Sequence, residues 1–197
     1  MASWNPLRNR PPPPVLAALF ALALALAAAL AAAPSAQAQP AALERQVKAA
    51  YLLKFAAFVE WPDGCFIRHD SPLVIGVLGA DELAGQLEAL VAAHPAAGRP
   101  IAIKRMKHGD APLHVHMLFL GALDKAVLGD VLGAVRGLPL LTVSDTREAY
   151  ALGSMINFVV AGERLRFEVA LKPAASARLR ISARMLSAAY RVQPGDA

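Results

Sequence analysis

The sequence contains a single cysteine, Cys65, so the chain can form no internal disulfide bond. Small exported domains often carry paired cysteines, and this chain folds without that covalent restraint. We interpret Cys65 as a small buried apolar residue, because free cysteine packs readily in protein interiors. The alternative is an exposed thiol after the turn-like residues 61–64, which could cross-link two copies of the chain under oxidation.

Acidic residues are absent from the first 38 positions, where Arg8 and Arg10 precede an apolar run over residues 15–33 and then Ala36-Gln37-Ala38. Positive charge, an apolar stretch and small residues in this order predict a secretory signal peptide over residues 1–38, cleaved after Ala38. A single exported domain over residues 39–197 would remain. The apolar run is 19 residues long, close to the ~20 that span a bilayer, so an uncleaved membrane anchor is the alternative.

A strong excess of positive charge is also missing from the predicted domain. The signal peptide removes two of the 20 basic residues and none of the 15 acidic ones, so the net charge falls from +5 to +3. This balance is too even to indicate a nucleic-acid partner. No stretch after residue 38 approaches ~18 uninterrupted apolar residues, so we expect no membrane span once the signal is cleaved.

Catalytic motifs are equally scarce. The sequence has no G-x-S-x-G and no G-x-G-x-x-G, and neither Ser144 nor Cys65 has a recognisable catalytic base. We therefore expect neither an enzyme nor a cofactor. His114 and His116 would share one face of a strand over residues 113–120, which makes them candidate metal ligands. A third ligand at a matching spacing is not evident, so hydrogen-bonded structural histidines are the preferred interpretation and no metal is expected.

Apolar residues recur with two periods along the rest of the chain. Residues 43–59 carry Leu43, Val47, Tyr51, Phe55 and Phe58 at spacings of four and three, which predicts an amphipathic helix. Mostly apolar runs over residues 73–79, 101–103, 113–120 and 140–143 predict buried strands, and helices are expected between them from Asp81 and over residues 127–135. Ser144-Asp145 with Glu148 resembles the cap of a short helix.

The last 45 residues change character. Residues 155–160 and 165–171 flank a turn, and the second segment alternates apolar and polar residues, which predicts a β-hairpin. Ser182 is expected to cap a final helix. The sequence as a whole predicts an α/β fold with a mixed, largely parallel sheet flanked by helices, a C-terminal antiparallel hairpin and an N-terminal amphipathic helix.

Two groups of side chains are candidate partner-binding residues. Tyr51, Phe55 and Trp61 concentrate aromatic area on the first helix and its exit, where core packing is the default explanation and docking on a partner is the alternative. Arg164 and Arg166 share the polar face of the hairpin. A solvated basic face is the default there, and contact with an acidic partner or anionic lipid is the alternative.

Several segments taken in order resemble the YfiR family of small exported regulatory proteins. The resemblance is carried by VKAAYLLKF at residues 47–55, FVEWP at 58–62, IGVLGAD at 75–81, GRPI at 98–101, HMLF at 116–119, LTVSD at 141–145, GSMINFV at 153–159, RLRFEV at 164–169 and LRIS at 179–182, followed by Met185 and Leu186.

This resemblance implies a periplasmic α/β domain that represses an inner-membrane diguanylate cyclase by binding its periplasmic sensor region, which would lower cyclic diguanylate and disfavour biofilm. A homodimer is expected as well, and a periplasmic module that binds a small anionic or aromatic molecule is the alternative function. Val115 stands where relatives often have a cysteine before the histidine, and Ala170 replaces a usual asparagine. The disulfides that stabilise some relatives cannot form in this chain.

Overall fold

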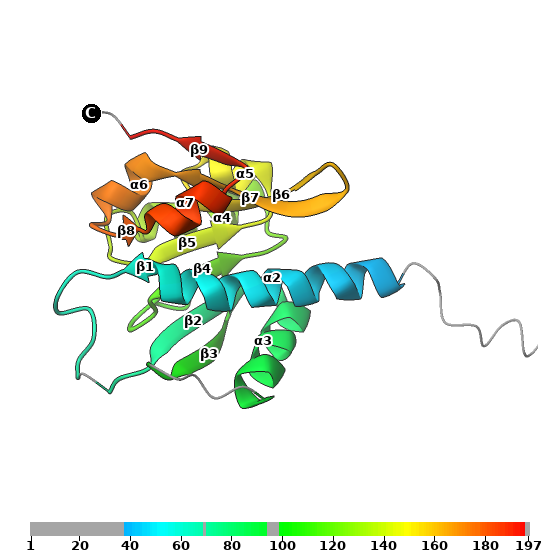
Figure 1. The fold of residues 1–197 in the computed structure, drawn as a ribbon. Helices are drawn as coiled ribbons and strands as arrows, with labels where there is room; N and C mark the ends of the chain where they lie inside the picture. Colours follow the sequence, from blue (N-terminus) through cyan, green and yellow to red (C-terminus); the bar gives the residue numbers. More distant parts are fainter. Residues whose placement is uncertain (1–37, 69, 94–98, 196–197) are drawn as a thin grey trace, which may run out of the picture. The chain divides into compact units, whose positions relative to one another are not determined.

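A seven-stranded sheet runs through the protein, with helices on both of its faces (Figure 1). In this computed structural model the described residues are 38–68, 70–93 and 99–195. Residues Ala41–Ala197 form one compact unit, with which this description is concerned. Residues 1–37 of the predicted signal peptide lie outside the described residues.

The strand order is β3-β2-β4-β5-β6-β7-β9. The five strands from β3 to β6 are mutually parallel, β6 and β7 form an antiparallel hairpin, and β9 is parallel to β7. The strands are β2 (Leu73–Leu78), β3 (Ile101–Met106), β4 (Met117–Leu120), β5 (Leu141–Ser144), β6 (Ile156–Ala161), β7 (Arg164–Ala170) and β9 (Arg191–Gln193). A separate antiparallel pair joins β1 (Val59–Glu60) to β8 (Arg180–Ile181). The largely parallel α/β sheet and the C-terminal hairpin are therefore as predicted.

Each face of the sheet has its own apolar cluster. Side chains alternate along a strand, so Met117 and Phe119 of β4 enter one cluster while Leu118 and Leu120 enter the other. Helices α2 (Ala38–Phe58), α3 (Asp81–Ala93), α6 (Leu171–Ser176) and α7 (Ala183–Ala188) cover the first face, and α4 (Lys125–Ala134) and α5 (Arg147–Ala151) cover the second. Because both faces are covered, the central parallel strands β2 and β4 are apolar throughout, whereas the edge strand β3 exposes Lys104 and Arg105.

The first helix buries a different stripe from the predicted one. Its core residues are Ala49, Leu52 and Phe55, whereas Leu43 is 62% exposed. Both sets have helical spacing, because apolar residues occur all around this helix. The predicted helix is present, but the prediction of its buried face was wrong at its N-terminal end.

Other boundaries also differ from the predictions. The strand expected over residues 113–120 begins only at Met117, because His114 has a left-handed φ of 59°, which interrupts extended backbone. Helix α5 is capped by Thr146, whose side chain accepts a hydrogen bond from the Ala149 amide, and not by Ser144 or Asp145. The predicted cap of the last helix is correct, since Ser182 accepts from the Met185 amide.

Candidate functional site

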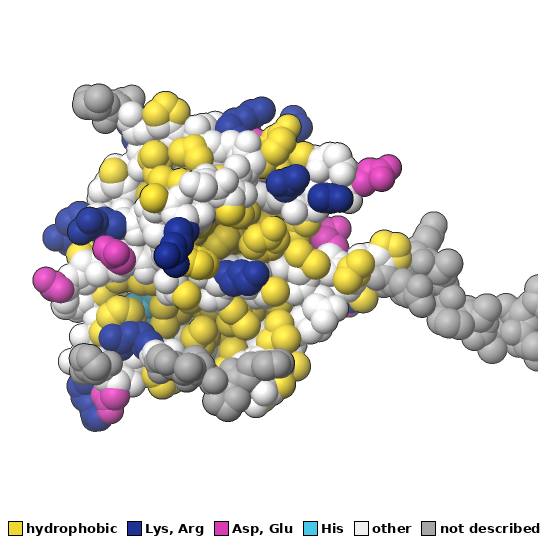
Figure 2. All heavy atoms as spheres, in the orientation of Figure 1, with side chains coloured by type: hydrophobic (Ala, Val, Ile, Leu, Met, Phe, Trp, Pro, Cys, Tyr) yellow, Lys and Arg dark blue, Asp and Glu magenta, His cyan; other side chains and the backbone are white. Residues whose placement is uncertain are grey.

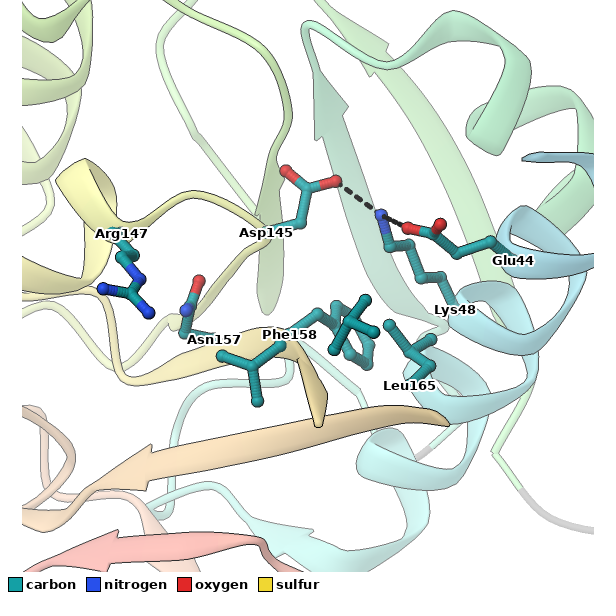
Figure 3. A pocket seen from close by; sticks show the side chains of 9 residues that line it. Glu44, Lys48, Asp145, Arg147, Asn157, Phe158 and Leu165 are labelled. Atoms are coloured by element: carbon teal, nitrogen blue, oxygen red, sulfur yellow. Dashed lines mark hydrogen bonds and ion pairs between the residues drawn. The ribbon is translucent and has the colours of Figure 1, made fainter. Parts of the chain in front are cut away.

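An ion-pair cluster joins helix α2 to the carboxyl end of β5 (Figure 3). Lys48 Nζ lies 2.8 Å from Asp145 Oδ2 and 2.7 Å from Glu44 Oε1. Glu44 is one turn before Lys48 on the helix, while Asp145 directly follows β5. Carboxyl ends of parallel strands are where open α/β sheets place their functional groups, so this cluster marks the natural site of the fold.

The Lys48 ammonium keeps its charge in this setting. Burial lowers the pKa of Lys48, but hydrogen bonds and charge interactions with Asp145 and Glu44 outweigh burial and leave that pKa above its ordinary value. The side chain is only 12% exposed, and two carboxylates share it. Lys48 is therefore a charged structural tether, and a lysine of this kind is a poor general base.

A cavity of about 230 Å³ opens beside this cluster. Asn157 of β6 and Arg147 of α5 supply polar groups to its lining, and Val160 and Leu165 of the hairpin supply apolar ones (Figure 3). Asn157 is 1% exposed, and its Oδ1 accepts a hydrogen bond of 3.0 Å from Ser144 Oγ. The cavity thus combines a buried amide, a guanidinium and an apolar wall.

The outward side of α2 forms a second candidate surface. A shallow hollow there, which we call the α2 outer face, is lined by Leu43, Gln46, Val47, Ala50, Tyr51 and Lys54. Figure 2 shows hydrophobic side chains gathered over the middle of this side of the molecule, with Lys and Arg side chains among and around them. An apolar surface rimmed by charge is typical of a protein-binding site.

The three predicted aromatic partner residues lie in different environments. Tyr51 is half-buried and packs on Phe158 and Phe167, with ring centroids 5.9 and 5.5 Å away. Phe55 is 2% exposed, so its side chain belongs to the core and would reach a partner only if α2 moved. Trp61 donates from Nε1 to the His116 carbonyl at 3.1 Å, which fixes the exit of the helix to the start of β4.

The two predicted arginines lie on the side of the hairpin away from α2. Leu165 and Phe167 alternate with them along β7 and pack in the cluster that contains α2, so Arg164 and Arg166 point to the other face. Both arginines are exposed. The structure therefore does not bring the aromatic and basic candidates together on one flat surface, and a partner touching both would have to wrap the hairpin.

The two candidate metal ligands do not share a face. His114 is exposed, whereas His116 is 6% exposed with both ring nitrogens engaged. Its Nδ1 accepts from the Val74 amide at 3.1 Å, and Nε2 lies 3.2 Å from the Cys65 carbonyl, which fits a neutral ring protonated on Nε2. The expectation that both imidazoles face the same way was wrong, because the strand does not reach them. Within the described ranges, no three His, Cys, Asp or Glu side chains are grouped as a metal site requires.

His116 holds the loop between β1 and β2 in place. Phe66 stacks on the His116 ring with centroids 4.4 Å apart, and the Arg99 guanidinium lies 3.7 Å from the Phe66 ring centre. Burial is the main reason that the pKa of His116 is lowered, and the charge of Arg99 adds to the effect. This arrangement supports the structural role that was preferred from the sequence.

Sequence reasoning missed the residues of the ion-pair cluster and the cavity. Lys48 lies next to the buried stripe of α2, and Asp145 and Asn157 follow or belong to buried strands. A polar residue within an apolar pattern was the available signal. This signal does not indicate which of these polar residues contact one another in the folded chain.

No helix in the described part of the chain has the length and apolar character needed to cross a bilayer. A protein-family model described as YfiR/HmsC-like matches residues 45–190. The match extends from α2, just before Lys48, to the residue before β9, so it includes Lys48 and Asp145, the rest of the cavity lining and the hairpin, while Glu44 lies one residue before it.

Proposed function

The chain belongs to the YfiR/HmsC-like family, and we propose that it is a periplasmic, non-enzymatic repressor of an inner-membrane diguanylate cyclase. It binds the periplasmic sensor region of the cyclase and thereby lowers cyclic diguanylate inside the cell. Export by the predicted signal peptide over residues 1–38 is part of the proposal. N-terminal sequencing of the periplasmic form should then begin at Gln39, and an intact Met1 would contradict cleavage.

The observation that carries the binding role is the two-sided apolar character of α2. One side of this helix supplies Ala49, Leu52 and Phe55 to the core, and the other side still presents Leu43 and Val47 on the α2 outer face. A helix that is apolar all around is normally covered on every side. The α2 outer face is therefore the surface we assign to the sensor region.

The charge around this surface specifies the chemistry of the partner. Lys54 belongs to the α2 outer face, whereas Arg164 and Arg166 lie on the opposite face of the neighbouring hairpin, where a partner that wraps the hairpin would meet them. An apolar helix or strand flanked by acidic side chains would complement it. A homodimer through this face is the competing occupant, and it would bring basic Lys54 side chains from both copies to one interface that supplies no acidic partner of its own.

Repression requires a difference in affinity between two states of the cyclase. To shift the ratio of active to inactive sensor from 99:1 to 1:99, the chain must bind the inactive state about 5.5 kcal/mol more tightly than the active one. Tight binding to both states would leave cyclase activity unchanged.

The test uses a cyclase whose gene lies beside that of this chain and which carries a periplasmic sensor region. Binding of the purified chain to that region should weaken about tenfold or more in the double variant Leu43→Glu/Val47→Glu, because two charges enter an apolar contact. Ile67→Glu is the matched control, since Ile67 is 75% exposed and lies outside the α2 outer face. Equal binding by the double variant and the control would remove the α2 outer face from the interface.

The basic hairpin is tested separately. Arg164→Glu/Arg166→Glu should weaken the complex most at low salt, because exposed charges are screened as ionic strength rises. Unchanged binding in this folded double variant would restrict the interface to α2. Light scattering of the chain alone checks the dimer, and a dimer that Leu43→Glu/Val47→Glu dissociates would show that copies of the chain compete for the same surface.

A further inference from the structure

Two hydrogen-bond donor groups that line the cavity beside Asp145 have no acceptor among the described residues. Asn157 uses its Oδ1 for Ser144, and its Nδ2 has no acceptor among the described residues. Arg147 likewise has no ion pair or side-chain hydrogen bond in the described ranges, and it lines the same cavity. Among the described residues the one fully buried side-chain polar atom without a partner is Tyr150 Oη, so the Asn157 Nδ2 is accessible, and because this side chain lines the cavity its donor is open to a ligand bound there.

We propose that this cavity binds a small organic carboxylate with a short apolar body. The planar guanidinium of Arg147 and the amide of Asn157 match the two oxygens of a carboxylate, and charge-assisted bonds of this type are the strongest available to it. The apolar body of the ligand packs against Val160 and Leu165 of the hairpin.

The lining explains why the ligand is an acid and not an amine. Both acidic residues of the cavity, Glu44 and Asp145, already share the Lys48 ammonium. In Figure 3, Arg147 and Asn157 lie on the side of the cavity away from Glu44. An incoming anion therefore meets donors at that end, while an amine would have to compete with Lys48 for its carboxylates.

The size of the cavity limits the ligand. About 230 Å³ is below the ~300–1,000 Å³ of sites for drug-sized molecules, so a short branched acid fits better than a large aromatic one. The lining contains Val160, which is 68% exposed and which a ligand would cover.

Binding at this site does not depend on the proposed repressor role, and the test uses the purified chain alone.

The experiment measures calorimetric binding and thermal unfolding with three probes of similar shape, isovalerate, isovaleramide and isoamylamine. Isovalerate should bind and raise the unfolding temperature, because a ligand of the folded state stabilises it. The neutral amide should bind about tenfold more weakly or worse, and the amine should not bind. Binding of isoamylamine in preference to isovalerate would overturn the proposal.

The variant Arg147→Gln should lose isovalerate affinity about tenfold or more while its unfolding temperature without ligand stays unchanged, because Arg147 is exposed and has no partner in the described residues. Arg136→Gln is the matched control, since Arg136 is also exposed but lies outside this cavity. Undiminished affinity in Arg147→Gln, or no isovalerate binding to the unaltered chain at millimolar concentration, would refute the site.

Discussion

Lys48 and Asp145 are separated by 97 positions in the sequence and form an ion pair of 2.8 Å that ties the first helix to the end of a central strand. Most of α2 is held by apolar packing, which is not directional. The ion pair adds a specific contact that fixes the rotation of the helix about its axis. It thereby determines which apolar residues enter the core and which remain on the α2 outer face.

Removing one member of this pair should therefore be costly. We expect Lys48→Met to lower the free energy of unfolding by about 1–3 kcal/mol, because two half-buried carboxylates lose their counter-ion. A double-mutant cycle with Asp145→Asn, measured by urea unfolding, should give a favourable coupling energy of about 1 kcal/mol. The matched control is Arg68→Gln, which removes the exposed Arg68–Asp70 pair and should change stability by less than about 0.5 kcal/mol. A coupling energy of zero would contradict the tether.

The sign of the pH dependence of this pair follows from the raised pKa of Lys48, where hydrogen bonds to Asp145 and Glu44 outweigh burial. A raised basic pKa gives stability that is complete below the unfolded-state value, about 10.4 for lysine, and is lost as the pH rises further. The difference in unfolding free energy between the unaltered chain and Lys48→Met should therefore persist at neutral pH and shrink in strong alkali.

Mild acid should weaken the protein through His116. Burial lowers the pKa of this histidine, so the unfolded chain takes up the proton first as the pH falls below about 6.5. Protonation also places a hydrogen on Nδ1, where the Val74 amide now donates. Stability should be greatest above that pH and should decline toward about pH 5, as measured by urea unfolding.

The variant His116→Asn should flatten this pH dependence, because an amide oxygen can accept from the Val74 amide without titrating. His114→Asn is the control, since His114 is exposed, and it should leave the decline intact. An unchanged slope in His116→Asn would assign the acid sensitivity to another group.

The sequence predicts the sheet well because its physical signals are local. Short, mostly apolar segments without alternation, such as LVIG and LLTV, favour strands covered on both faces, and both segments contribute to the sheet. Strands β1, β8 and β9 were not predicted, because two or three residues show no alternation. Their pairing depends on contacts between distant segments, such as Val59 with Ile181.

The site was harder to predict than the fold. A lysine such as Lys48 and an aspartate such as Asp145 are unremarkable in sequence, and only the packing of α2 across β5 brings them together. The rotation of α2 was mispredicted for a related reason. When apolar residues surround a helix, as Leu43, Val47 and Leu52 do here, periodicity alone cannot select the buried face.

The thiol of Cys65 should react slowly. Burial raises its pKa, and this outweighs the opposing effect of Arg178, so little thiolate is present at neutral pH. We expect iodoacetamide, followed by mass spectrometry at about pH 7, to alkylate the folded chain several-fold more slowly than the urea-unfolded chain. Equal rates would show an accessible, reactive thiol and would favour the alternative of cross-linked copies.

A pair of glycine substitutions tests the packing beneath the carboxyl end of the sheet. A Cβ on Gly121 would come within 2.4 Å of the Gly79 carbonyl oxygen, and the neighbouring backbone cannot easily move because the Gly121 amide donates to the Leu78 carbonyl at 2.9 Å. Gly121→Ala should therefore lower the free energy of unfolding by about 1–3 kcal/mol, a typical cost of overpacking. Gly129 lies inside helix α4 with open space where a Cβ would be, so Gly129→Ala should raise stability by up to about 1 kcal/mol. Chemical denaturation of the two variants measures both effects. If Gly129→Ala lost as much stability as Gly121→Ala, the close approach of Gly121 to Gly79 would not be the reason that glycine is needed at position 121.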